Sequence, residues 1–554
     1  MSEYVFFEDE VVECTKTTDL YQFFGLKRPN NILLSDEKTK NKLKNYILRE
    51  DESIDELRRK SIVMYLYISP KVQKNETIAQ ALYRAALEVT AEETTGTWDE
   101  NLKTITPEMI DSDSQKNLEI LQGKVIGLNV KNGMVACALP QEGFERGSLS
   151  QLFSVIVGNY TGMTSQVHAV RLEDCEIPDD FVNSFLGPCF GPFGIWRKIE
   201  TEEHTPLIGT IIKPKTGLSP RDWAKFADMA FRGGLDVVKD DENLTDQEYC
   251  TFYERAKIVL DALSKIKKDT GRTCVYVANI TAATTDEMIK RAQFVKDNGG
   301  NCIMIDIFAA GWTALQTIRS RFQDLIIHGH RAGHGAQTVV PEVTIDGKIK
   351  TIRHGIAMKI YCMFARLGGV DQLHIGAPLG KMEAHDQTIH ANLEMIRRPM
   401  GKINCCLAIN SGGISPDKFS EVLKAMDPTK AGVYTDIIFQ AGGGTHAHPL
   451  GTFGGAKTMM QARKKFKENI SLFDALNRFY ELRLAYRRWS KDTYDRWIKS
   501  LTSTSEVVID PDTRDVTNKG KDEPEPKKVV LKDAIERDPT LKEDIAKNNP
   551  SILN

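Results

Sequence analysis

The residues best suited to chemistry lie in one short stretch in the middle of the chain, residues 233–242. Here an apolar segment ends in Lys239, which is followed by Asp240, Asp241 and Glu242. Side chains alternate faces in a strand, so Lys239 and Asp241 are expected to point the same way, and Glu242 joins them if the chain bends there. Such a lysine is either simply neutralised by its acids or held for function.

The functional interpretation is a metal site. A neutral lysine amine can add carbon dioxide to form a carbamate, which is a negatively charged oxygen ligand. Together with Asp241 and Glu242, a carbamate on Lys239 gives three hard oxygen ligands. This set suits Mg2+, which keeps several waters or substrate oxygens in its coordination sphere.

Cationic residues follow two other apolar segments. Lys213-Pro214-Lys215 is either a solvated turn or a pair of pocket lysines, in which case the neighbouring cation lowers the pKa of Lys213 and lets it move protons. Residues 328–334 contain three histidines, which could bind zinc. Arg331 among them would repel a metal, and Arg beside His330 suits a phosphate oxygen instead. We interpret His328 as a packed strand residue.

Glycine-rich loops follow three further segments. The loop 376–381 comes after His374 and carries Lys381, which suggests either a lid that brings a cation to developing charge or an ordinary turn. Residues 411–413 and 442–444 are glycine runs, which are either tight turns or loops whose backbone N–H groups approach an anion.

These motifs follow apolar segments that alternate with helical ones at spacings of roughly 25–45 residues. The eight predicted strands end near Lys213, Lys239, Asn279, Asp306, His330, His374, Ser411 and Gly442. Eight βα units predict a closed (β/α)8 TIM barrel, in which the carboxyl ends of the strands form the face that carries active sites. The unusual residues therefore converge on one face.

The predicted fold is an α/β protein: the barrel with an N-terminal α+β domain and a C-terminal helical extension. The expected divisions are a mostly helical extension (1–60), the α+β domain (61–185), the barrel (200–460), C-terminal helices (461–502) and a charged, flexible tail (503–554). Residues near Pro188 and Pro192 are interpreted as a linker.

The composition is that of an ordinary globular protein. The 554 residues are 41% hydrophobic and 27% charged, with a net charge of −3, which gives no reason to expect nucleic acid or an anionic membrane as a partner. No apolar run could span a bilayer, and the first residues lack the pattern of a signal peptide. Ten scattered cysteines without a CxxC pair fit a reducing compartment. A cytoplasmic location is expected.

The motifs together resemble the large chain of ribulose-1,5-bisphosphate carboxylase/oxygenase (Rubisco), over roughly residues 60–460. The matching segments are TxxKPKxGL-like 210–218, GGxDxxKxDE-like 233–242, HxHRAxH-like 328–334, the loop 376–381, SGG at 411, GGGTxxHP at 442–449, Glu92 with Thr97-Trp98, and Gly158-Asn159. This resemblance implies carboxylation of ribulose 1,5-bisphosphate, and competing oxygenation by O2, through a Mg-bound enediolate that gives 3-phosphoglycerate.

The resemblance also implies residue roles. Lys239, carbamylated by an activating CO2, would bind Mg2+ with Asp241 and Glu242 and take the substrate's C3 proton. Lys213 would protonate the final carbanion, His330 would assist proton transfer, and Lys381, held by Glu92, would stabilise the added carboxylate. The remaining substrate contacts would be Thr97, Trp98, Asn159, Lys215, Arg331, His374, Ser411, Gly412, Gly442 and Gly443.

In this family a neighbouring chain completes the site with Glu92, Thr97, Trp98 and Asn159, so we expect a homodimer or an assembly of dimers, without a small subunit. Ile375 departs from the family pattern, and the segment after His334 looks expanded, with a hairpin-like stretch at 343–348. These departures indicate an archaeal-like form III or II/III member, a subgroup associated with nucleotide salvage. The alternatives are a Rubisco-like enolase or isomerase acting on another phosphorylated ketose, and a non-catalytic scaffold.

Overall fold

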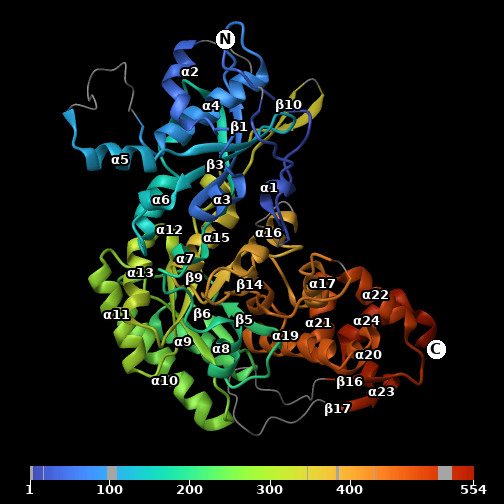
Figure 1. The fold of residues 1–554 in the computed structure, drawn as a ribbon. Coiled ribbons are helices and arrows are strands. Elements are labelled where there is room, and N and C mark those ends of the chain that lie inside the picture. The colour runs from blue at the N-terminus through green and yellow to red at the C-terminus, as the bar shows by residue number, and fades with distance from the viewer. Residues whose placement is uncertain are drawn as a thin grey trace.

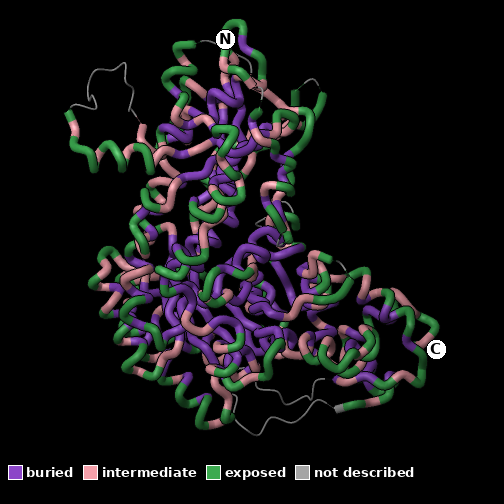
Figure 2. Tube along the Cα trace, viewed as in Figure 1, coloured by how far each residue is buried: buried purple, intermediate pink, exposed green. Residues whose placement is uncertain are grey.

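The computed structural model describes residues 4–16, 18–30, 32–35, 37–96, 109–345, 347–381, 386–429, 431–509 and 527–553. Figure 1 shows three regions: an N-terminal sheet domain at the top, a barrel below it, and a lobe of C-terminal elements beside the barrel. The buried residues form continuous cores inside the sheet domain and the barrel (Figure 2).

The N-terminal domain is built on a five-stranded sheet with the order β12-β4-β1-β3-β2. Its strands are β1 Ser61–Pro70, β2 Lys124–Asn129, β3 Met134–Pro140, β4 Val167–Glu176 and β12 Gly355–Ile356. β1 is central and pairs antiparallel with both β3 and β4. β12 comes from an insertion in the barrel and pairs parallel with β4, which joins the two domains through one sheet.

Both faces of this sheet are covered, because all ten residues of β1 are buried. Ile62, Met64, Leu66 and Ile68 pack in the large core that includes helix α4 (Ile78–Glu92), whereas Val63 and Tyr65 face the opposite side. There they meet Leu20, Phe24 and Leu26 of the N-terminal extension. Because side chains alternate between the two faces of a strand, β1 also presents an apolar face on which the N-terminal extension packs.

The other helices of this region are short. They are α1 Leu20–Phe23, α2 Glu37–Leu43, α3 Ile54–Lys60, α5 Ser112–Ile120, α6 Leu149–Ile156 and α7 Asp179–Val182, with 3-10 turns at Lys44–Tyr46, Gln141–Gly143 and Asn159–Gly162. The sheet and α4 agree with the expected N-terminal α+β domain.

The predicted TIM barrel is confirmed. Eight parallel strands close in the order β13-β14-β15-β5-β6-β7-β8-β9. They are β5 Leu207–Ile211, β6 Val237–Lys239, β7 Val275–Asn279, β8 Cys302–Asp306, β9 Ile326–His330, β13 Gln372–His374, β14 Leu407–Ser411 and β15 Ile437–Gln440. Each ends within about two residues of its expected position, inside the usual boundary error.

Helices surround the barrel. They are α9 Pro220–Arg232, α10 Phe252–Thr270, α11 Thr285–Asp297, α12 Ile307–Ala310, α13 Trp312–Arg321, α14 Gly335–Thr338, α15 Met358–Leu367, α16 Asp386–Arg397, α17 Phe419–Ala425, α18 Gly443–His446 and α19 Gly451–Lys467, with a 3-10 turn at Pro416–Lys418. The expected hairpin appears as β10 (Glu342–Ile345) and β11 (Lys348–Thr351).

The segment interpreted as a linker contains a helix, α8 (Gly191–Lys198). Its Ile195 and Trp196 are buried and pack with Leu207, Val237 and Val275, which lie at or near the starts of their strands. The helix therefore covers the end of the barrel opposite the expected site.

The C-terminal lobe contains α20 Leu472–Arg478, α21 Tyr480–Trp489, α22 Lys491–Ser500, α23 Leu531–Arg537, α24 Pro539–Asn548, a 3-10 turn at Pro550–Ile552, and the antiparallel strands β16 Glu506–Ile509 and β17 Lys527–Val530. The described residues beyond 503 thus differ from the expected flexible tail. Leu531, Leu541 and Ile545 are buried in the same core as Trp497 and Ile498 of α22. Spaced apolar residues among many charges are enough to dock these short helices.

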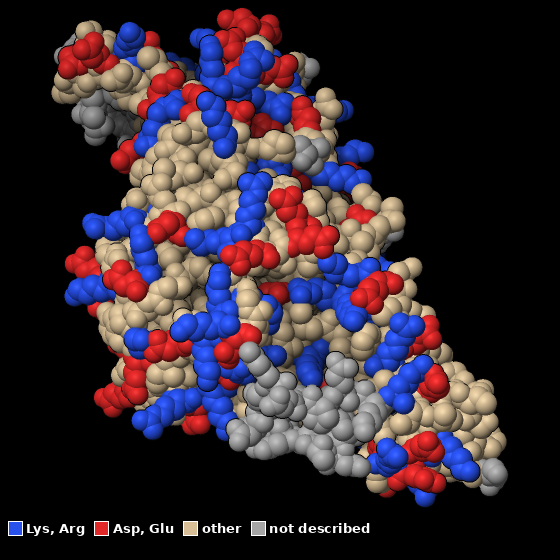
Figure 3. Space-filling view, turned by 90° about the horizontal axis from the view of Figure 1, so that it is seen from below, with Lys and Arg blue, Asp and Glu red and all other residues tan. Residues whose placement is uncertain are grey.

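The surface agrees with the small net charge. Lys and Arg side chains alternate with Asp and Glu over the face seen in Figure 3, without separating into regions of one sign. Among the described residues, no helix combines the length and the apolar character needed to cross a membrane.

Candidate active site

A cavity of about 980 Å3 opens at the carboxyl ends of the barrel strands. Its lining includes Lys213, Lys215, Lys239, Asp241, Glu242, His330, Arg331, His374, Lys381, Ser411, Gly412, Gly442 and Gly443. All of these were predicted site residues. The structure therefore brings together side chains that are spread over more than two hundred residues of sequence.

Lys239 lies at the floor of this cavity, at the end of β6. Its side chain is fully buried, and its Nζ donates to the backbone O of Asp240 (2.8 Å) and to Glu242 Oε2 (3.3 Å). Burial lowers the pKa of the Lys239 amine, although Glu242 and Asp241 oppose that shift. The Lys239 amine is therefore neutral, and so nucleophilic, more readily than the amine of an exposed lysine.

Asp241 is held by groups on two sides. Lys213 Nζ donates to its Oδ2 (2.7 Å), and the backbone N and side-chain Nδ2 of Asn243 donate to its Oδ1 (3.2 and 2.9 Å). The Asp241 side chain is 1% exposed, whereas that of Lys213 is 36% exposed and reaches the cavity. Lys213 therefore extends from the buried carboxylate of Asp241 into the open space of the cavity.

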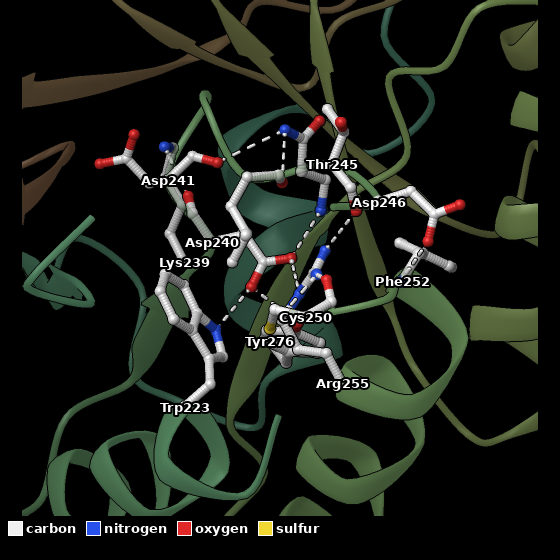
Figure 4. Close-up of polar contacts among 12 residues, drawn as sticks. Trp223, Lys239, Asp240, Asp241, Thr245, Asp246, Cys250, Phe252, Arg255 and Tyr276 are labelled. Atoms are coloured by element: carbon white, nitrogen blue, oxygen red, sulfur yellow. Dashed lines mark hydrogen bonds and ion pairs between the residues drawn. The ribbon is translucent and has the colours of Figure 1, made fainter. Parts of the chain in front are cut away.

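Asp240 does not line the cavity, and its carboxylate points towards Trp223, Tyr276 and Arg255 (Figure 4). Its Oδ1 accepts from Trp223 Nε1 (2.9 Å) and Tyr276 OH (2.7 Å), and its Oδ2 accepts from Asn279 N (3.1 Å) and Arg255 Nε (3.3 Å). Asp240 and Arg255 are both fully buried. Four donors on one carboxylate fix the backbone between Lys239 and Asp241.

The donor set fits a hard divalent cation only if Lys239 contributes. Within the described residues, no three His, Cys, Asp or Glu side chains converge as a metal site. Asp241 and Glu242 provide two carboxylates, and the Lys239 amine lies 3.3 Å from Glu242 Oε2. A carbamate on this amine would supply the third oxygen ligand that Mg2+ needs.

Histidines form a connected group beside the acids. His328 Nε2 and His374 Nε2 are 2.8 Å apart, and His374 Nδ1 lies 2.8 Å from Ser411 Oγ. His330 Nε2 lies 3.4 Å from Glu242 Oε2. Burial, together with Lys239 and Arg331, lowers the pKa of His330 well below its usual value, so this imidazole is neutral. His328 is a packed strand residue, as interpreted, and orients His374.

The loop 376–381 and the two glycine runs lie close together at the mouth of the cavity. The backbone N of Lys381 donates to Gly412 O (2.9 Å), and Lys381 itself is exposed. A Cβ on Gly413 would come within 2.8 Å of the Lys381 side chain, and a Cβ on Gly442 within 3.2 Å of Lys213 Cε. Glycine at these positions leaves room for the two lysines.

The N-terminal site residues lie elsewhere in this chain. Asn159 Nδ2 donates to Glu92 Oε1 (3.3 Å), so these two predicted residues do meet. Neither lines the cavity, whose described lining residues all come from residue 211 onward. Thr97 and Trp98 lie outside the described residues.

Sequence reasoning missed several residues at the site. Trp489 of α21 and Lys418 line the cavity although they were assigned no role. Asp306 lies at the end of β8, where burial and the charge of Glu242 raise its pKa to about 6. Its position at a predicted strand end was the available signal, whereas nothing in the sequence brings Trp489 to the barrel mouth.

Comparison with known families agrees with this geometry. The family described as "Ribulose bisphosphate carboxylase large chain, catalytic domain" matches residues 194–489, and the corresponding N-terminal domain family matches residues 53–181. The catalytic-domain match alone covers more than half of the chain.

Relatives and solved structures point the same way. A protein named ribulose bisphosphate carboxylase from Methanosarcina mazei is 38% identical over 423 residues, covering 74% of this chain and 92% of the relative. The octameric Rubisco of Pyrococcus horikoshii is 31% identical with a TM-score of 0.70, covering 81% of this chain and 97% of that one. The dimeric Rubisco of Hyperthermus butylicus is 31% identical with a TM-score of 0.69, covering 81% and 99%. The expected resemblance is confirmed: this chain belongs to the ribulose bisphosphate carboxylase large-chain family, and it is similar to archaeal members.

Proposed function

We propose that the protein carboxylates ribulose 1,5-bisphosphate to give 3-phosphoglycerate, with O2 as a competing reactant. The observation that carries this proposal is the single cavity in which Lys239, Asp241 and Glu242 lie among cationic side chains and glycine loops. Acids for a divalent cation and cations for two phosphates suit a doubly phosphorylated sugar. The family membership supports the same reaction.

Mg2+ would be held by Asp241, Glu242 and a carbamate formed from Lys239 and CO2. The buried, pKa-lowered amine of Lys239 supports this modification, since only a neutral amine adds to CO2. When bound, Mg2+ would polarise the carbonyl of the sugar and stabilise negative charge on its oxygens.

Two side chains are suited to moving protons. The imidazole of His330, 3.4 Å from Glu242 Oε2, would assist as the sugar is enolised, while the carbamate on Lys239 would take the C3 proton. The Lys213 amine lies at the cavity edge on Asp241 and would deliver the proton to the carbanion released at the end. Because Asp241 orients Lys213, its amine stays directed at one point of the cavity.

The cationic and glycine groups would bind the ends of the substrate. Arg331 and His374 would bind one phosphate, and the backbone of Gly442 and Gly443, with Thr97 and Trp98, the other. Lys381 would stabilise the new carboxylate from the lid. Ser411 would contact a hydroxyl, Gly412 would support that contact, and Lys215 would support Lys213. All of these except Thr97 and Trp98 line the cavity.

A second copy of the chain would complete the site with its Glu92, Thr97, Trp98 and Asn159. The described lining of the cavity contains no N-terminal residue. The outward-facing side of a bound substrate is therefore left for these residues of the second copy, which supports this arrangement. The two structural relatives are an octamer and a dimer. We therefore propose a homodimer or a larger assembly of dimers without a small subunit. Similarity to archaeal members supports nucleotide salvage as the source of the substrate.

The test is incubation of the protein with labelled bicarbonate, Mg2+ and ribulose 1,5-bisphosphate. Labelled 3-phosphoglycerate is expected. Its absence, in a folded protein whose carbamate is detected, would refute carboxylation. Exchange of the substrate's C3 proton without labelled product would instead indicate the Rubisco-like enolase, and neither activity would indicate a scaffold.

A further inference from the structure

Residues 414–418 directly follow the glycine run after β14. At this segment the loop after β14 meets the loop after β15 and the loop 376–381. A Cβ on Gly444 would lie 2.7 Å from Ile414 O and 2.9 Å from Ser415 Cα, so the loop after β15 rests on this segment. Lys418 Nζ donates to Leu379 O (3.2 Å), which ties the segment to the lid loop. A shift here would move all three loops together.

Asp417 fixes this segment from the side away from the cavity. Asp417 as a whole is 8% exposed, and its carboxylate accepts from two hydroxyls: Ser415 Oγ on Oδ1 (2.6 Å) and Ser490 Oγ on Oδ2 (2.5 Å). Its backbone O accepts from Tyr486 OH (3.1 Å). One carboxylate thus bridges the loop after β14 and the junction between α21 and α22.

The α21–α22 junction is itself tied to the C-terminal module. Arg487 Nε donates to Asp544 Oδ2 (2.6 Å), and Tyr494 OH donates to the same oxygen (3.1 Å). Asp544 belongs to α24, which packs with α22 in the core. Between Tyr486 and Ser490 lies Trp489, whose side chain lines the cavity. The C-terminal lobe therefore reaches the site both by contact and through Asp417.

We propose that Asp417 is a positioning residue for the reaction, holding the loops after β14 and β15 and the base of the lid in register through its bridge to Ser490. This inference rests on the proposed function, because it assigns Asp417 to the site that binds the sugar bisphosphate. Asp417 does not line the cavity, so it acts through Ser415 and Lys418 and not by touching the substrate.

The chemistry explains why a carboxylate occupies this position. Two hydroxyl donors on opposite oxygens need an acceptor at each, which a carboxylate provides and a side-chain amide does not. Hydrogen bonds to a charged group are stronger and shorter than neutral ones, in agreement with the 2.5 and 2.6 Å distances. Losing the bridge frees the loops without removing any group that contacts the substrate.

The experiment compares Asp417→Ala, Ser490→Ala and Ser490→Thr in the full-length protein. Ser490→Ala loses one charge-assisted hydrogen bond, so we expect its KM for ribulose 1,5-bisphosphate to rise about tenfold, and that of Asp417→Ala, which loses two, at least as much. Ser490→Thr keeps the hydroxyl and should restore the wild-type KM. A thermal-shift titration with ribulose 1,5-bisphosphate reads the same loss of affinity without turnover.

The matched control is Asp474→Ala. Asp474 also accepts a serine hydroxyl, from Ser471 Oγ at 2.7 Å, but at the start of α20, and its loss should leave KM unchanged. If Asp417→Ala fails to fold, Ser490→Ala decides. A wild-type protein that makes no labelled product refutes the proposed function. An active wild type whose Ser490→Ala variant keeps its KM and its ligand-induced shift overturns the role of Asp417.

Discussion

Replacing Asp240 by Asn should both destabilise the barrel and lower the activity of the site. Each carboxylate oxygen of Asp240 accepts two hydrogen bonds, from Trp223 and Tyr276 on one side and from Arg255 and Asn279 on the other. Asn has one oxygen and one NH2 group, so the NH2 must face one of these donor pairs. The substitution also leaves the buried Arg255 guanidinium without its counter-charge.

The magnitude follows from these contacts. Removing one partner of a buried ion pair costs about 3–5 kcal/mol. Tyr276→Phe removes only one of the four hydrogen bonds and keeps the charge, which predicts a loss of about 1.5–3 kcal/mol. Asp240→Asn should therefore be clearly the more destabilising of the two. Its activity should fall further than its folded fraction, since Lys239 and Asp241 flank the lost anchor.

The assay is urea unfolding followed by tyrosine and tryptophan fluorescence, with carboxylation measured under conditions where each variant is folded. Asp371→Asn provides the control. Asp371 is a buried acid that pairs with Arg319 and accepts the backbone N–H of Phe190 and Ile327, near the closed end of the barrel. It should lose similar stability but keep the turnover of its folded fraction. Equal destabilisation by Asp240→Asn and Tyr276→Phe would refute the reasoning.

Three further predictions concern single side chains. Lys239→Ala should abolish turnover while the far-ultraviolet circular dichroism stays that of the wild type; retained activity would contradict the metal site. Lys381→Ala should lower kcat by roughly 10²-fold, yet change the free energy of unfolding by less than about 0.5 kcal/mol because Lys381 is exposed; an unchanged kcat would show that Lys381 takes no part in the reaction. Burial raises the pKa of Glu93 to about 7, so the folded state holds this proton while the unfolded state loses it, and stability falls as pH rises from about 4.5 to 7. Glu93→Gln should therefore gain about 1–2 kcal/mol over the wild type at pH 8 after allowance for solvent screening, with a smaller gain at pH 5; thermal midpoints showing the same gain at both pH values would count against it.

Much of the barrel could be predicted because each strand is an apolar run with an abrupt polar end. The same rule placed Lys239, Lys213 and His374 on one face, since parallel strands in a closed barrel end together. The prediction depended only on local pattern and on that closure. It needed no knowledge of which helix packs against which strand.

Features that depend on distant packing could not be predicted. The N-terminal extension looks polar, and its scattered Leu20, Phe24 and Leu26 gain a role only when a sheet face lies opposite them. The helices of residues 531–548 likewise look solvated until α22 provides their apolar partner. Trp489, the last residue of α21, reaches the cavity because α21 packs against α19 and the turn at Pro416–Lys418. In each case the signal is split between segments far apart in the sequence.

The chemistry of the site depends on the burial of Lys239, which the residues at the rim of the cavity cannot maintain alone. An amine as deeply buried as that of Lys239 loses part of its basicity, which makes it a nucleophile, but it also needs acids close by. Those acids repel each other unless other groups hold them: Lys213 and Asn243 hold Asp241, while the anchor at Asp240 fixes the backbone between. The reactive amine and its acids are therefore set by contacts beneath the cavity, whereas the loops above it, joined at Asp417, set the room left for the sugar. Variants of the lower layer should therefore change how readily the site is activated, and variants of the upper layer how tightly it binds its substrate.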